Sequence, residues 1–340
     1  MSKEHLTYFK VENFKRFDSL ELNDIGQFNL IVGDNNVGKT SVLEAISSIS
    51  ALDKKDPKTI CEDLCQSFIR RNINLKGSTA SFFSLLAKND NDPIRILTKI
   101  NSEQSVEVIL KKENNPALMN IRVYGYGNYL LEANTSPTNE KQVNTSFIPA
   151  NIDTSNNLSG AYQAVLNFSR SNKRLIINNL KVIDQTITDI EVLPIQEVPH
   201  VMIGFENNDR YLPLTSMGES AIRVFYYLLR IISEKGQRLM IDEIDTGIHY
   251  SRMKNFLTTL IKIAINNDVQ LFMTTHSLEC QQAFAEVFEA PDMVQNQEKV
   301  RQFTLIEKPD GQVIASGRDF EQLQSALETG YDTRGGERRW

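Results

Sequence analysis

Residues 33–40 have the types and spacing of a phosphate-binding loop. They read Gly-Asp-Asn-Asn-Val-Gly-Lys-Thr, which fits the pattern G-x-x-x-x-G-K-[ST] at every fixed position. Such a loop presents backbone N–H groups to phosphate, its lysine reaches the β- and γ-phosphates, and its hydroxyl residue binds Mg²⁺. The pattern predicts a bound nucleoside triphosphate with Mg²⁺, contacted by Gly33, Asp34, Asn35, Asn36, Val37, Gly38, Lys39, Thr40 and Ser41.

Two acidic residues follow a short apolar run in the second half of the chain. Residues 239–241 read Leu-Met-Ile, a buried strand, and Asp242 and Glu243 come directly after it. Here Asp242 is expected to hold the water shell of Mg²⁺. Glu243 is expected to orient or deprotonate the water that attacks the γ-phosphate. The alternative interpretation is an exposed strand end or a helix cap, and the presence of the phosphate loop favours catalysis.

A histidine follows a second apolar run. Residues 272–277 read Phe-Met-Thr-Thr-His-Ser, a strand that ends in a polar cluster. Ligands bind at the carboxyl ends of parallel strands in open α/β sheets. We therefore predict that His276 bonds the γ-phosphate and senses its hydrolysis. The alternative is that Ser277 caps a helix and that the histidine beside it is incidental.

A second candidate anion site lies at residues 214–220, immediately before an apolar helix pattern. Ser216, Gly218 and Glu219 stand at the start of that helix, where N–H groups and the helix dipole attract anions. One nucleotide needs one phosphate cradle, so a second cradle suggests a composite site. In such a site ATP lies between the phosphate loop of one protomer and residues 216–218 of another. An ordinary capped helix start explains this segment equally well by itself.

The elements that must position these residues follow an α/β pattern. A strand at 27–32 precedes the phosphate loop and a helix follows it, with two further strands at 6–12 and 19–22. Beyond residue 199, alternating strands and helices predict a parallel sheet covered by helices. Turn residues separate four short β-like runs that predict an antiparallel sheet, at 94–100, 106–111, 121–126 and 129–133.

The middle of the chain is predicted to be an insertion. Residues 134–158 are rich in Asn, Ser, Thr and Pro, and helical patterns follow at 160–169 and 173–190. We predict one ATPase domain with three segments. These are an N-terminal lobe with the antiparallel subdomain at 1–133, an arm at 134–198, and a C-terminal lobe at 199–340. The arm is the predicted partner surface.

Composition limits the function classes. The 340 residues have a net charge of −6, so the chain as a whole does not bind polyanions. No apolar run reaches 18 residues, and the charged N-terminus is unlike a signal peptide, so we expect a cytoplasmic protein without membrane contact.

Cys61 and Cys65 lack partners for a zinc site and are expected to be ordinary thiols. Three basic clusters could form a local patch, although scattered solvated charges explain each one better: Lys10, Lys15 and Arg16; Arg170, Lys173 and Arg174; Arg334, Arg338 and Arg339.

The order of these motifs resembles that of an ABC-type ATPase head. The phosphate loop is followed by Ser-x-Gly-x-Ser at 216–220, Asp-Glu-x-Asp at 242–245 and Thr-His-Ser at 275–277. Residues 9–17 and 33–41 are similar to the RecF- and SMC-like branch, and within it to the OLD-like "AAA family" ATPases of bacterial antiphage systems. The resemblance implies an α/β ABC-type P-loop head with a mixed central sheet flanked by helices, an antiparallel β subdomain and a small helical insertion.

The resemblance also implies roles for individual residues. Lys39 and Thr40 hold ATP and Mg²⁺, Asp242 holds Mg²⁺, and Glu243 is the catalytic base. In the family pattern, further positions act across a dimer or sense the γ-phosphate, and they correspond to Ser216, Gly218, Asp245 and His276. Residues 215–219 read Thr-Ser-Met-Gly-Glu instead of Leu-Ser-Gly-Gly-Gln, and the glutamine that links the two lobes has no clear counterpart. Slow hydrolysis is therefore expected.

The resemblance implies partners as well. No Asp-x-Asp strand of a Toprim nuclease follows Ser277, so we expect a homodimer or larger homo-oligomer that controls a separate effector, a nuclease or toxin, in antiphage defence. The main alternative is a RecF-like ATPase of DNA repair that binds DNA ends or gaps, with nucleic acid as a further ligand. A transporter ATPase fits poorly because its signature differs, and a P-loop kinase lacks both the signature and the histidine.

Overall fold

The computed structural model describes residues 5–49, 86–100, 104–112, 119–124, 129–132, 146–150, 158–168, 171–206 and 208–330. The predictions for Cys61, Cys65, Arg170 and the three C-terminal arginines fall outside these ranges, as does most of the loop predicted at 134–158. Within the described part of the chain, no helix combines the length and hydropathy needed to cross a membrane.

A mixed six-stranded sheet forms the centre of the molecule, in the order β15-β14-β3-β13-β12-β8. Neighbouring strands from β14 to β8 are parallel, and only β15 runs antiparallel at one edge. The strand that leads into the phosphate loop, β3, therefore lies inside the sheet between β13 and β14. The strands are β3 (Phe28–Gly33), β8 (Phe147–Ile148), β12 (Arg238–Ile241), β13 (Gln270–Thr274), β14 (Val300–Glu307) and β15 (Val313–Arg318).

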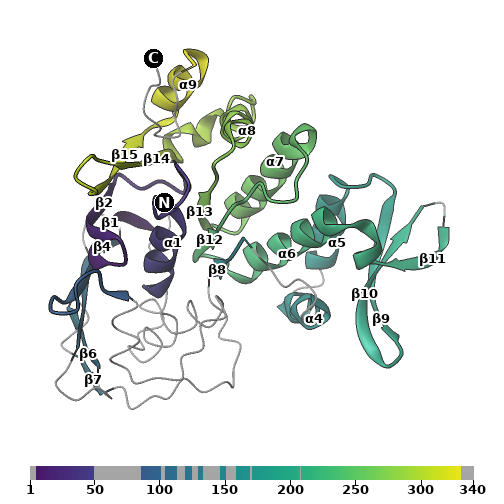
Figure 1. Cartoon of the computed structure of the whole chain (residues 1–340). Coiled ribbons are helices and arrows are strands. Elements are labelled where there is room, and N and C mark those ends of the chain that lie inside the picture. The colour runs from purple at the N-terminus through teal and green to yellow at the C-terminus, as the bar shows by residue number, and fades with distance from the viewer. Residues whose placement is uncertain are drawn as a thin grey trace.

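A second, antiparallel sheet covers one side of the central sheet, with helix α1 (Lys39–Ser48) between them (Figure 1). Its strand order is β2-β1-β4-β5-β6-β7. Helix α1 buries nearly its whole length because it has a sheet on either side. The strands are β1 (Leu6–Phe14), β2 (Phe17–Asn23), β4 (Ile94–Ile100), β5 (Gln104–Lys112), β6 (Met119–Tyr124) and β7 (Tyr129–Glu132).

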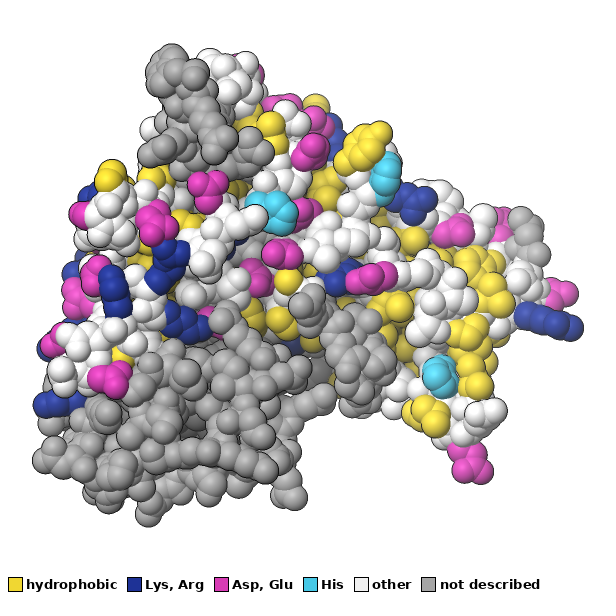
Figure 2. All heavy atoms as spheres, viewed as in Figure 1, with side chains coloured by type: hydrophobic (Ala, Val, Ile, Leu, Met, Phe, Trp, Pro, Cys, Tyr) yellow, Lys and Arg dark blue, Asp and Glu magenta, His cyan; other side chains and the backbone are white. Residues whose placement is uncertain are grey.

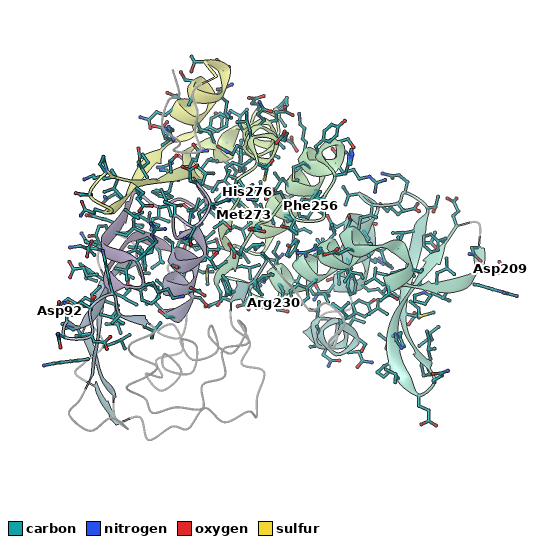
Figure 3. The ribbon with its side chains drawn as sticks, viewed as in Figure 1. Asp92, Asp209, Arg230, Phe256, Met273 and His276 are labelled. Carbon is teal, nitrogen blue, oxygen red and sulfur yellow. The ribbon has the colours of Figure 1, made fainter. Side chains whose placement is uncertain are left out.

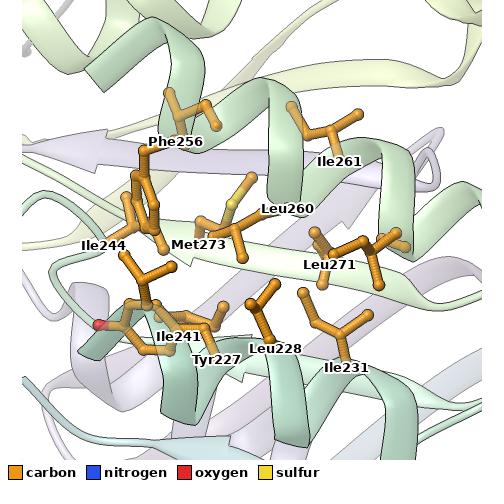
Figure 4. Packing of buried hydrophobic residues seen from close by; sticks show 14 of the residues in the cluster. Tyr227, Leu228, Ile231, Ile241, Ile244, Phe256, Leu260, Ile261, Leu271 and Met273 are labelled. Carbon is orange, nitrogen blue, oxygen red and sulfur yellow. The ribbon is translucent and has the colours of Figure 1, made fainter. Parts of the chain in front are cut away.

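Helices cover the opposite side of the central sheet. Helices α6 (Glu219–Ser233) and α7 (Tyr250–Asn266) lay side chains such as Leu228 and Leu260 over Ile241 and Leu271 of the strands (Figure 4). Other elements complete this layer and its flanks: α4 (Leu158–Phe168), α5 (Ser171–Leu180), α8 (Leu278–Phe288), η4 (Val294–Lys299) and α9 (Phe320–Glu328).

The central sheet separates two hydrophobic cores because its side chains alternate between its faces. On β3, Phe28, Leu30 and Val32 point into the core beneath the helices, whereas Ile31 joins the core around α1. The strands β12 and β13 follow the same alternation. This pattern fixes the register of β3 and therefore the direction in which the chain leaves the sheet at Gly33.

A third sheet, β11-β10-β9, projects from the helical side (Figure 1). It consists of β9 (Ile187–Ile195), β10 (Val198–Phe205) and β11 (Asn208–Pro213), and the short helix η3 (Leu214–Met217) leads from it into α6. The helix predicted over 173–190 is wrong at its end, since α5 stops at Leu180 and β9 starts at Ile187. An Asx turn breaks the helix: Asp184 Oδ1 accepts hydrogen bonds from both N–H and Oγ1–H of Thr186, at 2.9 and 2.7 Å. The predicted boundary at residue 198 also falls inside this sheet.

Candidate active site

The phosphate loop connects β3 to α1 at the carboxyl end of the central sheet. Val37 is buried in the core around α1, whereas Asp34, Asn35 and Asn36 are exposed. Gly38 has a φ of +107°, and a Cβ at this position would lie 2.6 Å from Cζ of Phe17 on β2. The loop is thus anchored from within by a valine and admits only glycine where β2 approaches it. Its polar middle faces outward, where a phosphate can reach its N–H groups.

The side chain of Lys39 folds back over the loop. Its Nζ donates to the carbonyl oxygens of Gly33 and Asp34, both at 2.9 Å. An ammonium group has three N–H donors, so two of them fix the lysine in place and the third is left to point at a phosphate oxygen. Burial lowers the pKa of Lys39, and nearby carboxylates, with Asp242 and Glu243 foremost, oppose this shift. The cation and the two acids therefore lie close together.

Thr40 and Asp242 meet directly. Thr40 Oγ1 donates to Asp242 Oδ2 at 2.9 Å, which joins the first turn of α1 to the end of β12. Both atoms are hard oxygen donors, and Asp242 is almost completely buried. Two protein oxygens suit Mg²⁺, because this ion keeps several waters and takes its remaining ligands from the substrate phosphates. The residues present fit the cation that the sequence predicted.

Glu243 adopts a backbone conformation that is unusual for its residue type. Its φ is +48°, a left-handed value that few residues other than glycine, asparagine and aspartate adopt. One of its carboxylate oxygens, Oε2, accepts a hydrogen bond from Thr246 Oγ1 at 3.2 Å. Its N–H donates to Oγ1 of Thr274, at the end of the neighbouring strand β13, at 2.8 Å. Sequence reasoning missed Thr274 because the hydroxyl acts through a contact between segments 31 residues apart.

His276 lies just beyond β13, on the same edge of the sheet (Figure 3). Its side chain is exposed, whereas Thr274 and Thr275 before it are buried. Ser277 caps α8, as the alternative interpretation expected: its Oγ accepts from Cys280 N–H at 3.0 Å. The histidine is therefore at the predicted rim, and its role toward a γ-phosphate stays a prediction.

The second candidate anion site is exposed at the start of α6. Ser216, Gly218 and Glu219 are all accessible, and a Cβ on Gly218 would meet no atom within 4 Å. The hydrogen bonds of Ser216 and Glu219 are local: Ser216 Oγ donates to Pro213 O at 2.7 Å, and Glu219 accepts from Arg223 of the same helix. Residues 216–219 are thus open to solvent.

Arg223 ties this segment to two others, and sequence reasoning missed it. The side chain is buried, and its guanidinium donates to Glu219 Oε1 at 2.7 and 2.9 Å and to Ala150 O at 3.0 Å. A Cβ on Gly247 would lie 3.3 Å from Arg223 Cδ and Nε. The arginine therefore contacts the start of α6, the stretch after β8, and the loop after the two acids. The available signal was the presence of two arginines, Arg223 and Arg230, within a largely apolar helix pattern.

The loop after the acids carries a buried oxygen atom without a partner. Asp245 Oδ1 is inaccessible and accepts no hydrogen bond within the described part of the chain. Nearby, Ser220 Oγ donates to the carbonyl oxygen of Gly247, which fixes the loop against α6. A carboxylate oxygen removed from water without a donor is costly. Asp245 is thus a position where an additional donor stabilises the protein.

The basic clusters do not form a patch within the described residues. Lys10, Lys15 and Arg16 each pair with a different carboxylate: Glu12 at 2.6 Å, the buried Glu44 of α1, and Glu307 at 2.6 Å. Lys173 likewise pairs with Asp189 and Glu191. The structure supports the interpretation of scattered, paired charges. Lys15 and Arg16 nevertheless hold the β1–β2 turn against α1 and β14, beside Gly38.

Taken together, the carboxyl edge of the central sheet assembles the phosphate loop, Asp242, Glu243 and His276, with Asp245 nearby. The segment 216–219 lies on a different element and points outward. A strand-loop-helix phosphate cradle, at the same sheet edge as a strand that ends in two acids and separated from it by one strand, defines a P-loop ATPase head. Comparisons with known proteins agree with this class.

Residues 28–279 match the family described as "AAA domain, putative AbiEii toxin, Type IV TA system". Because the match spans most of the chain, the protein belongs to this family. An "ATP/GTP phosphatase" of Helicobacter pylori (strain ATCC 700392 / 26695) is 22% identical over 331 residues, which cover 83% of this chain and 88% of the relative. The predicted enzyme class, a P-loop ATPase, is confirmed.

Solved structures of SMC heads share the fold. A head bound to the C-terminal winged-helix domain of ScpA superimposes with a TM-score of 0.58 at 9% identity, covering 94% of this chain and 99% of that one. A head with an extended coiled coil bound to the C-terminal domain of ScpA from Pyrococcus furiosus gives 0.55, with coverage of 96% and 99%, also at 9% identity. The predicted ABC-type, SMC-like fold is confirmed.

Proposed function

We propose that this ATPase closes a dimer around ATP and thereby controls a separate effector protein, a nuclease or toxin of an antiphage-defence system. The single observation that carries the proposal is the division of the site. One edge of the sheet holds the phosphate loop and the acids, whereas Ser216 and Gly218 lie exposed on another element with only local hydrogen bonds. The two halves complement each other when two copies face each other.

The state of Asp245 supports the same arrangement. Its Oδ1 is buried and has no donor within the described part of the chain. In the proposed dimer this residue lies at the seam; because its Oδ1 is inaccessible in the single chain, its side chain has to turn outward before a donor from the second copy reaches it. Closure then satisfies a group whose desolvation is otherwise uncompensated.

The residues on this edge divide the work of hydrolysis. Lys39 and the loop N–H groups bind the β- and γ-phosphates, and Thr40 with Asp242 holds Mg²⁺. When bound, the metal neutralises charge that develops on the phosphate oxygens. Glu243 orients the attacking water and takes its proton, and exposed His276 contacts the γ-phosphate. The hydrogen bond from Thr246 occupies one acceptor site of Oε2 and leaves the other carboxylate oxygen, Oε1, for the water.

An exposed apolar face supports the existence of a separate partner. Among the residues that the structure describes, five of the seven exposed large hydrophobic residues belong to the third sheet: Leu193, Ile195, Val198, Tyr211 and Leu212. The pairing of Val198 with Ile195, and of His200 with Leu193, places most of them on one face of β9 and β10. Figure 2 shows hydrophobic side chains gathered over this sheet. We assign this exposed face to the effector.

The defence role draws on two further facts. The family's description names a toxin of a type IV toxin–antitoxin system, and the sequence resembles the OLD-like ATPases of antiphage systems. Both support an ATPase that works beside a toxic activity, and such an activity has to be kept inactive until it is needed. Coupling that activity to closure of the dimer meets this requirement.

The decisive experiment measures molar mass by light scattering. Glu243→Gln binds ATP without hydrolysing it, and we expect this variant to form dimers with ATP and Mg²⁺ but not with ADP. Adding Ser216→Arg places a bulky cation at the proposed seam, so the double variant should bind ATP and stay monomeric. Thr215→Arg on the same exposed helix start tests whether any arginine there has this effect. Dimers of the Ser216→Arg double variant would argue against the composite site.

The same samples address the RecF-like alternative. We expect no ATP-dependent affinity for duplex or gapped DNA at physiological salt, because Lys10, Arg16 and Lys173 are paired with carboxylates. A salt-sensitive, ATP-dependent affinity would favour the repair function instead.

A further inference from the structure

The buried hydroxyl group of Thr274 contacts both acids of the proposed site. Thr274 is the last residue of β13 and has no accessible surface. Its Oγ1 donates to Asp242 Oδ1 at 2.6 Å and accepts from the N–H of Glu243 at 2.8 Å. Its carbonyl oxygen accepts from Ile244 N–H at 3.0 Å. One residue therefore holds three consecutive positions, 242 to 244, against the neighbouring strand.

The first of these bonds fixes the rotation of the Asp242 carboxylate. Oδ1 receives the hydroxyl of Thr274 from β13, and Oδ2 receives the hydroxyl of Thr40 from α1. The two threonines approach from different elements, so the plane of the carboxylate is set by both. Without Thr274 the group can rotate about its Cβ–Cγ bond, and Oδ2 is then no longer directed at the phosphate loop.

The second bond holds the backbone where it turns. Glu243 has a φ of +48°, which is unfavourable for a residue with a Cβ. The bonds from Glu243 N–H and Ile244 N–H to Thr274 offset this cost and set the direction in which the Glu243 side chain leaves the backbone. The position of the proposed base thus depends on a side chain that lies on another strand.

Packing alone does not require a hydroxyl here. The three residues before it on β13, Leu271, Phe272 and Met273, are apolar and buried, and valine has the same shape as threonine. A buried hydroxyl group needs hydrogen-bond partners. The hydroxyl of Thr274 finds both of its partners at the two acidic residues: it donates to the Asp242 carboxylate and accepts from the Glu243 N–H.

We propose that Thr274 is a positioning residue of this ATPase: its hydroxyl aligns Asp242 and Glu243 and touches neither ATP nor the attacking water. This inference rests on the proposed function, since it assumes that Asp242 serves the metal and Glu243 serves the water. Misplacing such groups by a fraction of an ångström to about 1 Å costs up to about 100-fold in rate.

The test compares Thr274→Val, which removes the hydroxyl at constant shape, with Thr274→Ser, which keeps it. For Thr274→Val we expect kcat to fall about 10- to 100-fold, and the Mg²⁺ concentration for half-maximal binding of a fluorescent ATP analogue to rise several-fold. Binding of the analogue without Mg²⁺ should stay within about threefold of wild type, because Lys39 and the loop are untouched. Thr274→Ser should restore both the rate and the Mg²⁺ dependence to within about threefold.

A matched control removes a buried hydroxyl elsewhere. Thr98 is as deeply buried as Thr274, and its Oγ1 donates to Val106 O in the antiparallel sheet. Thr98→Val should leave both kcat and Mg²⁺ dependence unchanged, whatever it does to the unfolding temperature. Should Thr274→Val fail to fold, Thr274→Cys, whose thiol is a weak hydrogen-bonding group, is expected to show the same loss.

The outcomes are distinguishable. If Thr274→Val or Thr274→Cys folds and matches wild type in rate and Mg²⁺ dependence, or if Thr274→Ser is as impaired as Thr274→Val, the positioning role is overturned. Glu243→Gln is measured in parallel. If Glu243→Gln does not hydrolyse ATP while Thr274→Val hydrolyses it at the wild-type rate, only this inference is overturned. If Glu243→Gln hydrolyses ATP at the wild-type rate, both the proposed base and the inference are overturned.

Discussion

Thr40 and Asp242 lie 202 residues apart in the chain, yet Thr40 Oγ1 donates to Asp242 Oδ2 at 2.9 Å. The contact exists because β3 and β12 end at the same edge of the central sheet, with β13 between them. It joins the helix that follows the phosphate loop to the strand that carries the acids. The catalytic predictions below depend on this connection.

Replacing Lys39 by alanine should abolish ATP binding. The variant loses the cation that reaches the β- and γ-phosphates and the two bonds that close the loop at Gly33 and Asp34. We expect the affinity, measured by calorimetric titration, to fall at least about 100-fold, as suits the loss of a charge-assisted contact and its loop geometry. Lys262→Ala, which removes an exposed ion pair with Asp292, is the control. Binding within about threefold of wild type would contradict the assignment.

Glu243→Gln should separate binding from hydrolysis. The amide has the shape of the carboxylate but accepts no proton, so kcat is expected to fall about 100-fold or more. The dissociation constant for ATP should change little. Phosphate release in single-turnover and steady-state assays measures the first effect, and titration with a fluorescent analogue measures the second. Glu286→Gln, at an exposed pair with Lys254, should behave as wild type.

Arg223→Met should destabilise the fold through the carbonyl that it leaves without a donor. The buried guanidinium bonds the carbonyl oxygen of the half-buried Ala150 at 3.0 Å, and leaving this carbonyl without a donor should cost about 1 kcal/mol, at the low end of the range for buried groups. Urea unfolding measures the loss. Glu219→Gln removes the charge of the largely exposed partner and should cost about 0.5 kcal/mol or less. Equal losses in the two variants would show that the ion pair, and not the carbonyl, carries the effect.

Stability should fall on acidification, in part because of His5. The imidazole is buried, its Nε2 bonds Asp268 O at 3.0 Å, and burial lowers its pKa below the ordinary 6.5. The unfolded chain then binds more protons than the folded one, so this contribution is present above about pH 6.5 and is lost as the pH falls below it. We expect His5→Gln, whose amide can keep the bond to Asp268, to lose less stability than wild type between pH 7.5 and pH 5.5. Urea unfolding at both pH values measures the free energy of unfolding. An equal loss between the two pH values in wild type and His5→Gln would exclude the histidine as a cause.

The exposed face of β9 and β10 should be dispensable for ATP hydrolysis but required by the effector. Leu193 and Val198 are 38% and 56% exposed, so Leu193→Asp with Val198→Asp should change the folding free energy by about 0.5 kcal/mol or less. Co-purification with the product of the adjacent gene should be lost while ATP turnover is kept. The matched control is Tyr250→Asp on α7, which is 71% exposed and lies outside the third sheet. Retained co-purification would move the effector to another surface.

The sequence predicted those parts of the fold in which local pattern and tertiary structure agree. The strand–helix alternation predicted beyond residue 199 is present, with β12, α7, β13 and α8 in succession, because short apolar runs and longer helical patterns follow one another there. The helix predicted through 190 was wrong beyond Leu180, because Ile183 and Ile187 continue the helical spacing of Ile176 and Leu180 only by coincidence. The Asx turn at Asp184 decided against it.

Some residues of the candidate site could be predicted from the sequence and others could not. The phosphate loop and the two acids were predictable because their chemistry is concentrated in short motifs. Thr274 and Arg223 were not, because each acts through hydrogen bonds to segments far away in the chain. A buried hydroxyl at a strand end and one arginine in an apolar helix are weak signals until their partners are known.

Ile31 and Val32 are consecutive in β3 and yet belong to the two separate cores. Shortening Ile31 therefore weakens the core around α1, whereas shortening Val32 weakens the core beneath α7 and α8. A geneticist thus has two adjacent codons with which to make heat-sensitive alleles that weaken opposite sides of one sheet.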